Sequence, residues 1–141
     1  MLIVTPGFNF NGSCEEAMRL YEKAFGTTIE FMLRYSDADE RDWKTPLTDE
    51  QKNMVYHAEM FLGSQRLMFS DIIEFDLSQG NSLFLTVTFD DAESVKQAYQ
   101  VLQEGSTIVF PMKSTTYSSC FVSLVDRFGI RWVLMTEQTE R

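Results

Sequence analysis

Apolar and polar positions along the chain follow two rhythms, one typical of helices and one typical of strands. Two segments, residues 13–26 and 90–105, repeat their apolar residues with helical spacing. The first opens with SCEE at 13–16, the Ser-x-x-Glu pattern of a capping box, and ends at Gly26. The second opens at Asp90, with Glu93 three residues later, and ends at Gly105. The pattern predicts two amphipathic helices.

The remaining apolar segments have the alternation, or the short continuous runs, of β-strands. They are residues 3–10, 28–36, 54–62, 65–71, 82–89, 107–112, 117–125 and 130–136. Two pairs of these segments are separated by turns that contain Gly63 and Gly129, and each pair is predicted to form a hairpin. The order is therefore strand, helix, three strands, and then the same again.

This order indicates an internal repeat. The sequence GTTI at 26–29 parallels GSTI at 105–108, and Phe10 parallels Phe89, at an offset of about 79 residues. The predicted fold class is α+β, with two βαβββ modules at about 1–71 and 82–136 in a single domain of residues 1–141. The modules are expected to need each other, because a sheet covered by one helix leaves its second face bare.

The composition argues against several classes of function. The chain has 141 residues, of which 44% are hydrophobic and 23% charged, as expected for one ordinary core. Its 12 Lys and Arg against 21 Asp and Glu give a net charge of −9, which argues against nucleic acid as a partner. No apolar run suits a membrane span, and the first ten residues do not resemble a signal peptide. Cys14 and Cys120 form no CxxC pair, so reduced thiols in a cytoplasmic protein are expected.

Three stretches carry a resemblance to a known family. They are FNFNGSCEEAMRLYEKAFG at 8–26, VYHAEMFLGSQRLMFSD at 55–71 and DRFGIRWVLM at 126–135. Together with the doubled module they resemble the PhnB-like branch of the vicinal oxygen chelate superfamily, which has the glyoxalase/bleomycin resistance fold. The resemblance implies cupped mixed sheets, a small organic ligand and a homodimer. The methyltransferase label common in this branch finds no support, since no glycine-rich nucleotide loop follows a strand.

The resemblance also implies a divalent metal in the cup, held by His or Glu from the first and last strands of each module. Carried over, those positions fall near Pro6, Met68, Leu83 and Val133. None of these side chains is a carboxylate, imidazole or thiolate donor. The sequence therefore predicts no metal and no cofactor.

His57 is the only histidine and the only side chain whose unperturbed pKa lies near neutral pH. Glu59 follows at i+2, so on a strand both point to one face together with Phe61. The pair has the chemistry of an acid/base couple. The alternative is an imidazole that packs on a strand beside a solvated carboxylate.

Other candidates are expected to bind a ligand rather than react. Met68 and Ser70 share a face of their strand, and Asp71 ends it, where Ser and Asp also commonly cap turns. Tyr35, Tyr117 and Ser119 are possible lining groups with an equally simple place in the core. Cys120 is predicted to be a buried thiol rather than a nucleophile.

The polar segment 37–53 interrupts the first module, and Trp43 lies within it. A tryptophan in a polar loop usually covers something apolar, so the segment is either a lid over a ligand or a solvated surface loop.

Two functions follow. The first is a metal-free small-molecule-binding protein with Met68, Ser70, Asp71, Tyr35, Tyr117, Ser119 and Trp43 as ligand-binding candidates. The second is an enzyme that uses His57 and Glu59 as acid and base on a small organic substrate. The sequence leaves open whether any reaction is catalysed.

Overall fold

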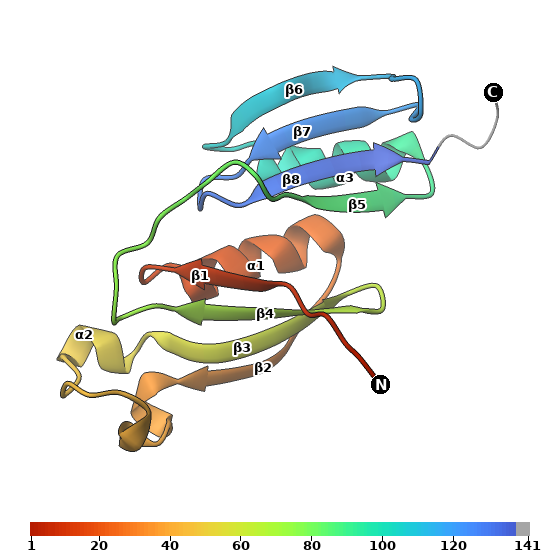
Figure 1. The fold of residues 1–141 in the computed structure, drawn as a ribbon. Helices are drawn as coiled ribbons and strands as arrows, with labels where there is room; N and C mark the ends of the chain where they lie inside the picture. Colours follow the sequence, from red (N-terminus) through yellow and green to blue (C-terminus); the bar gives the residue numbers. More distant parts are fainter. Residues whose placement is uncertain (138–141) are drawn as a thin grey trace. The chain divides into compact units, whose positions relative to one another are not determined.

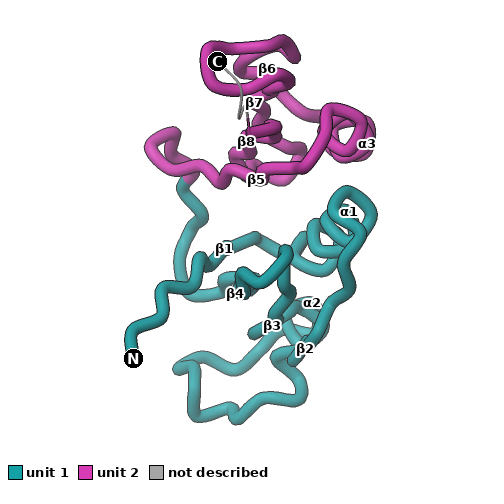
Figure 2. The backbone as a smooth tube through the Cα atoms, turned by 90° about the vertical axis from the view of Figure 1, so that its right-hand side faces the viewer, with its two compact units in different colours: residues 1–78 teal, residues 79–141 magenta. Residues whose placement is uncertain are grey.

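The computed structural model describes residues 1–137. The chain divides into two compact units, unit 1 with residues 1–78 and unit 2 with residues 79–141 (Figures 1 and 2). Unit 1 contains β1 (Gly7–Phe10), α1 (Cys14–Phe25), β2 (Ile29–Arg34), η1 (Tyr35–Asp37), η2 (Glu40–Asp42), α2 (Asp49–Lys52), β3 (Val55–Leu62) and β4 (Gln65–Asp71). Unit 2 contains β5 (Leu85–Phe89), α3 (Ala92–Leu102), β6 (Thr107–Lys113), β7 (Phe121–Val125) and β8 (Arg131–Thr136). The units correspond to the two modules that the sequence repeat predicts.

Both units have the same sheet topology, which confirms the predicted α+β class. The strand order is β1-β4-β3-β2 in unit 1 and β5-β8-β7-β6 in unit 2. The first and last strands of each module pair in parallel, and all other pairs are antiparallel. Each module is thus a mixed four-stranded sheet.

One face of each sheet is buried under its helix. In unit 1 the buried residues of β3 and β4 include Ala58, Met60, Leu67 and Phe69, and the Tyr21 ring of α1 lies 6.2 Å from the Phe69 ring. In unit 2 the corresponding core residues are Val122, Leu124, Trp132 and Leu134 of the sheet with Val95, Ala98 and Leu102 of α3. Alternation along the strands therefore leaves every second side chain on the opposite, more open face.

Several strands begin later than the sequence predicts, and β2 ends earlier, whereas β4 has the predicted bounds. β1 begins at Gly7 rather than residue 3, because Pro6 has no N–H to donate and offers only its carbonyl, to Met68. β5 begins at Leu85 rather than residue 82, and Leu83 before it is 85% exposed. β2 ends at Arg34, after which Tyr35 enters a 3₁₀ turn.

Both helices form, and Ser13 is the N-cap residue of α1 as predicted, but the details of the N-terminal caps differ from the prediction. Ser13 precedes α1 without a side-chain hydrogen bond, so the predicted capping box is wrong. The cap of α3 is Asp91, which accepts from the Ser94 N–H, and not Asp90. Gly26 adopts the left-handed conformation that ends α1, with φ of 64°, as predicted.

Candidate functional site

The open face of the first sheet brings together side chains of β3 and β4. The register pairs Glu59 with Met68 and Phe61 with Arg66. Ala58 and Met60 are buried on the α1 side, so His57 and Glu59 lie on the opposite face. Because residues paired across strands share a face, this face also carries Met68. The sequence analysis placed His57 with Glu59 on one strand face and Met68 with Ser70 on another, and the register of the two strands brings these faces together.

His57, Glu59 and Arg66 form a row of polar groups on this open face. The His57 Nε2 atom lies 2.7 Å from Glu59 Oε2, and Arg66 lies 3.5 Å from the other carboxylate oxygen. The hydrogen bond from His57, helped by the charge of Arg66, holds the pKa of Glu59 below its usual range. An ionised carboxylate only accepts, so Nε2 carries the hydrogen and Nδ1 of a neutral ring is left as an acceptor.

Apolar groups flank this row. The Phe31 ring of β2 lies 6.1 Å from the His57 ring, and Phe31 is 48% exposed. Phe61 is also exposed, and Met68 lies opposite Glu59 on β4. The face therefore combines exposed aromatic surface with a hydrogen-bonding row, which is the mixture that organic ligands require.

Ser70 and Asp71, neighbours on β4, point to opposite faces. Ser70 Oγ donates to Asn9 Oδ1 at 3.0 Å on the edge strand β1. Asp71 is buried on the α1 side, with 1% exposure. The two residues therefore have different surroundings.

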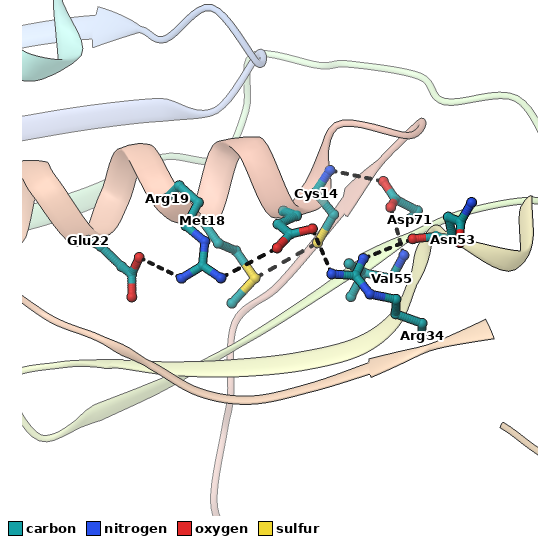
Figure 3. Close-up of polar contacts among 9 residues, drawn as sticks. Cys14, Met18, Arg19, Glu22, Arg34, Asn53, Val55 and Asp71 are labelled. Carbon is teal, nitrogen blue, oxygen red and sulfur yellow. Dashed lines mark hydrogen bonds and ion pairs between the residues drawn. The ribbon is translucent and has the colours of Figure 1, made fainter. Parts of the chain in front are cut away.

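Asp71 is a buried hydrogen-bond centre (Figure 3). One carboxylate oxygen accepts from the backbone N–H groups of Gly12 and Cys14, and the other accepts from Val55 N–H, at 2.8 to 3.0 Å. Figure 3 shows the contacts with Cys14 and Val55. It therefore serves as the acceptor at the start of α1 that Ser13 does not supply. The sequence left two roles open for Asp71, ligand binding and capping. The three hydrogen bonds to backbone N–H groups support capping.

Tyr35 and Trp43 lie together away from the His57 row. Tyr35 is buried, and its hydroxyl donates to the Asp71 carbonyl at 2.7 Å. The Trp43 ring packs against Tyr35 and Tyr56, with centroids 5.3 and 5.7 Å apart. Trp43 thus covers apolar surface, as expected, and fixes part of segment 37–53 to the sheet. Whether this segment acts as a lid stays a prediction.

Segment 37–53 is further tied down at its C-terminal end. Arg34 donates to the Asn53 carbonyl at 2.9 Å and to Glu15 of α1 at 2.8 Å (Figure 3). Thr48 and Gln51 form a reciprocal capping box on the short helix α2. The sequence analysis missed this box, although the Thr-x-x-Gln pattern signals it.

The other candidates belong to unit 2. Tyr117 is 48% exposed, and its ring lies 6.0 Å from Phe121. Ser119 Oγ and Thr136 Oγ1 are hydrogen-bonded at 2.5 Å. Cys120 is buried, as predicted. These residues have partners of their own within unit 2.

The positions that the resemblance implies for metal ligands, and the residues paired with them across the parallel strands, include no carboxylate, imidazole or thiolate in either module. Gly7 pairs with Met68 in unit 1, and at the same register Thr86 pairs with Val133 in unit 2. Of the positions carried over from the resemblance, Pro6 directly precedes β1 and Leu83 precedes β5. Within residues 1–137 no group of three or more His, Cys, Asp and Glu side chains is placed to hold a metal ion. A glycine, a thioether, a hydroxyl and an isopropyl group do not fit a divalent cation.

Hollows in unit 1 lie around segment 35–53 and were not predicted. A groove of about 760 Å³ runs along Tyr35, Trp43 and Leu47, with Lys44 and Lys52 on its wall. A second, smaller pocket of about 200 Å³ lies among Trp43, Tyr56 and Phe75. The isolated Trp43 in a polar loop was the only sequence signal for them.

The architecture defines the class of protein. The chain has the glyoxalase/bleomycin resistance fold: a solved glyoxylase/bleomycin resistance protein/dioxygenase domain from Frankia sp. superposes with a TM-score of 0.70 at 9% identity, covering 100% of this chain and 95% of that one. At this identity the likeness concerns the fold alone. Within residues 1–137 no helix is long and apolar enough to cross a membrane.

Within this fold the chain is similar to PhnB-like proteins. Protein PA1353 from Pseudomonas aeruginosa is 28% identical with a TM-score of 0.84, over 98% of this chain and 99% of that one. A PhnB protein from Bacillus cereus is 26% identical with a TM-score of 0.78, over 96% and 99%. Protein YjdN from Escherichia coli is 18% identical over 136 residues, 93% of this chain and 92% of that protein. No family model matches. The predicted resemblance to the PhnB-like branch of the vicinal oxygen chelate superfamily is confirmed.

Proposed function

We propose that this protein binds a small organic molecule without a metal, on the open face of its first sheet. The observation that carries the proposal is the row of His57, Glu59 and Arg66 beside exposed aromatic rings. The row supplies a hydrogen-bond acceptor at His57 Nδ1 and a cation at Arg66, while Phe31 and Phe61 supply apolar contact. Solved relatives of the fold include a protein described as a glyoxylase/bleomycin resistance protein/dioxygenase domain.

The donor chemistry at the inherited metal positions supports binding without a metal. The side chains of Met68 and Gly7, and those of Val133 and Thr86, offer no anionic ligand that would offset the hydration a dication loses there. Both cysteines are free and buried, which supports the proposal of a cytoplasmic protein with reduced thiols.

A thermal-unfolding screen tests both parts of this proposal. We expect a planar organic ligand to raise the midpoint equally with and without a chelator, and Arg66→Ala to remove the shift. Glu30→Gln, an exposed carboxylate change on β2, is the control. Elemental analysis after dialysis is expected to show well under one transition metal per chain. A chelator-resistant stoichiometric metal, or ligands that stabilise only with a metal present, contradicts the proposal.

The second candidate function is an enzyme that uses His57 as a general base positioned by Glu59. The 2.7 Å contact favours it, because a carboxylate that holds Nε2–H fixes the tautomer and leaves Nδ1 to take a proton. We expect His57→Gln to abolish turnover of a metabolite pool followed by mass spectrometry, and Ser94→Ala to leave it unchanged. Equal consumption by wild type and His57→Gln excludes the catalytic role.

A further inference from the structure

A small pocket in unit 1 has walls unlike those of the open sheet face. Its volume is about 200 Å³, and its lining consists of four aromatic rings, two carboxylates and two isoleucines, with no Lys or Arg. The rings are Tyr35, Trp43, Tyr56 and Phe75, and the carboxylates are Asp42 and Glu74. His57, Glu59 and Arg66 are not part of it, so the pocket is separate from the site proposed above.

Three of the rings are set at angles to one another around this pocket. Trp43 meets Tyr56 at 83° and Tyr35 at 67°, with centroids 5.7 and 5.3 Å apart. Tyr35 and Tyr56 are 4.9 Å apart. When neighbouring rings are steeply inclined to one another, at least one ring turns its face toward the space that they border. The face of an aromatic ring attracts a cation through the quadrupole of the ring.

The rings are held in place by the protein itself. The Tyr35 hydroxyl donates to the Asp71 carbonyl at 2.7 Å, and the Tyr56 hydroxyl donates to Asp42 at 2.8 Å. A ligand therefore meets walls that are already ordered, which lowers the entropy that binding costs.

The charge around the pocket is negative. Burial raises the pKa of Tyr35 to about 12, and the charges of Asp71 and Glu74 contribute in the same direction. The hydrogen bond to Asp42 raises the pKa of Tyr56, again with help from Glu74. Glu74 contributes negative potential at both hydroxyl groups and Asp42 contributes it at that of Tyr56, and a cation is attracted by the same potential. The basic residues Arg41, Lys44 and Lys52 line the larger groove instead.

We propose that this pocket binds a compact organic cation, a methylated or primary ammonium group, caged by Trp43, Tyr35 and Tyr56 and neutralised by Asp42 and Glu74. Its volume lies below the ~300–1,000 Å³ of sites for drug-sized ligands, so the occupant is a small ammonium group rather than a large molecule. This activity goes beyond the ligand proposed for the open sheet face.

Choline and its neutral isostere, in which carbon replaces the quaternary nitrogen (dimethylbutanol), test the proposal on the wild-type protein. Binding is followed by calorimetry and by tryptophan fluorescence, since the chain has 2 tryptophans and only Trp43 lines the pocket, while Trp132 is buried in unit 2. We expect choline to bind at least about tenfold more tightly than the isostere, because several rings and two carboxylates each favour the cation. Equal binding of the two, or no binding of choline, overturns the proposal.

Variants locate the site. Trp43→Leu keeps apolar volume but removes the π face, and we expect about tenfold weaker choline binding, with smaller losses for Asp42→Asn and Glu74→Gln. Phe110→Leu and Glu30→Gln, which lie outside the pocket, are expected to bind choline like wild type. A folded Trp43→Leu variant with unchanged affinity overturns the assignment. If that variant does not fold, as judged by its unfolding transition, the isostere comparison decides alone.

Discussion

Asp71 shows how much of the first module depends on one side chain. Its carboxylate joins the start of α1, through Gly12 and Cys14, to the start of β3, through Val55. All three donors are backbone N–H groups; the contacts of Cys14 and Val55 are buried, and that of Gly12 is partly buried. Leaving such groups unsatisfied costs more than a hydrogen bond gains on the surface.

Asp71→Asn is therefore expected to lower the free energy of unfolding by about 2–4 kcal/mol, because the amide turns an NH₂ group toward at least one of these donors. Urea unfolding measures the loss. Ser70→Ala, which removes only the partly exposed contact with Asn9, is the matched control and is expected to change stability little. An Asp71→Asn variant as stable as wild type would contradict this role.

The residue-scale predictions succeeded where the argument needed only strand alternation. His57 and Glu59 at i and i+2 share a face for geometric reasons, and the structure brings them within 2.7 Å. Arg66 was missed because its position depends on the register between β3 and β4, which pairs it with Phe61. Sequence spacing within one strand holds no information about that register.

At the scale of elements, the apolar pattern located both helices. The polar residues at their N-terminal ends did not reveal which side chains accept hydrogen bonds there. The acceptor at the start of α1 comes from Asp71, 57 residues after Cys14 in the chain, so no local pattern reveals it. For α3 the cap is local, but Asp90 and Asp91 are adjacent and both precede the stripe. Only the extended backbone of Asp91 directs its carboxylate at the Ser94 N–H.

This pair of aspartates offers a prediction with its own control. Asp91→Ala is expected to lower the thermal midpoint at neutral pH, and Asp90→Ala to leave it close to wild type. The Ser94 N–H holds the pKa of Asp91 below its usual range, so its contribution is present above the unfolded-state pKa and is lost as pH falls through the lower folded-state value. The difference between the variants should vanish in acid. A difference that persists at low pH, or a larger effect of Asp90→Ala, would contradict the assignment of the Asp91 carboxylate as the cap of α3.

The ends of strands were harder to predict than their alternation. The apolar residues at 1–4 suit a strand by composition, yet they precede Pro6 and lie outside the ladder. Tyr35 likewise continues the apolar pattern of β2, but its hydroxyl is held by the Asp71 carbonyl and the chain turns. In both places a tertiary or covalent constraint decides where the pairing stops.

At the scale of the whole molecule, the two modules repeat a topology while their end contacts diverge. Asp71 and Thr136 occupy equivalent positions, opposite Phe10 and Phe89 on the first strand of each module. Each side chain accepts a hydrogen bond from a backbone N–H group near the start of the third strand of its module. The donor is Val55, the first residue of β3, for Asp71 and Cys120, the residue before β7, for Thr136. Thr136 has one oxygen where Asp71 has two, and α3 accordingly carries its own cap, Asp91. The repeat is therefore evident in topology and only faintly in sequence.

The assembly of the molecule provides the last prediction. Within the described residues the outer strands of each sheet are β1 and β2 in unit 1 and β5 and β6 in unit 2. Beside β1, the side chains of Leu2, Ile3 and Val4 are 85%, 68% and 75% exposed. Open edges next to exposed apolar residues favour association, and we expect a second copy of this chain to cover them.

Light scattering at micromolar concentration is expected to give twice the chain mass of 16.3 kDa. Val4→Asp places a charge among the exposed apolar residues and should shift the protein toward the monomer, because burial of an unpaired carboxylate opposes association. Gln65→Glu, at the exposed first residue of β4, adds the same charge elsewhere and should leave the dimer intact. A wild-type mass of one chain excludes the dimer, and a dimer unaffected by Val4→Asp places its interface away from the N-terminal residues.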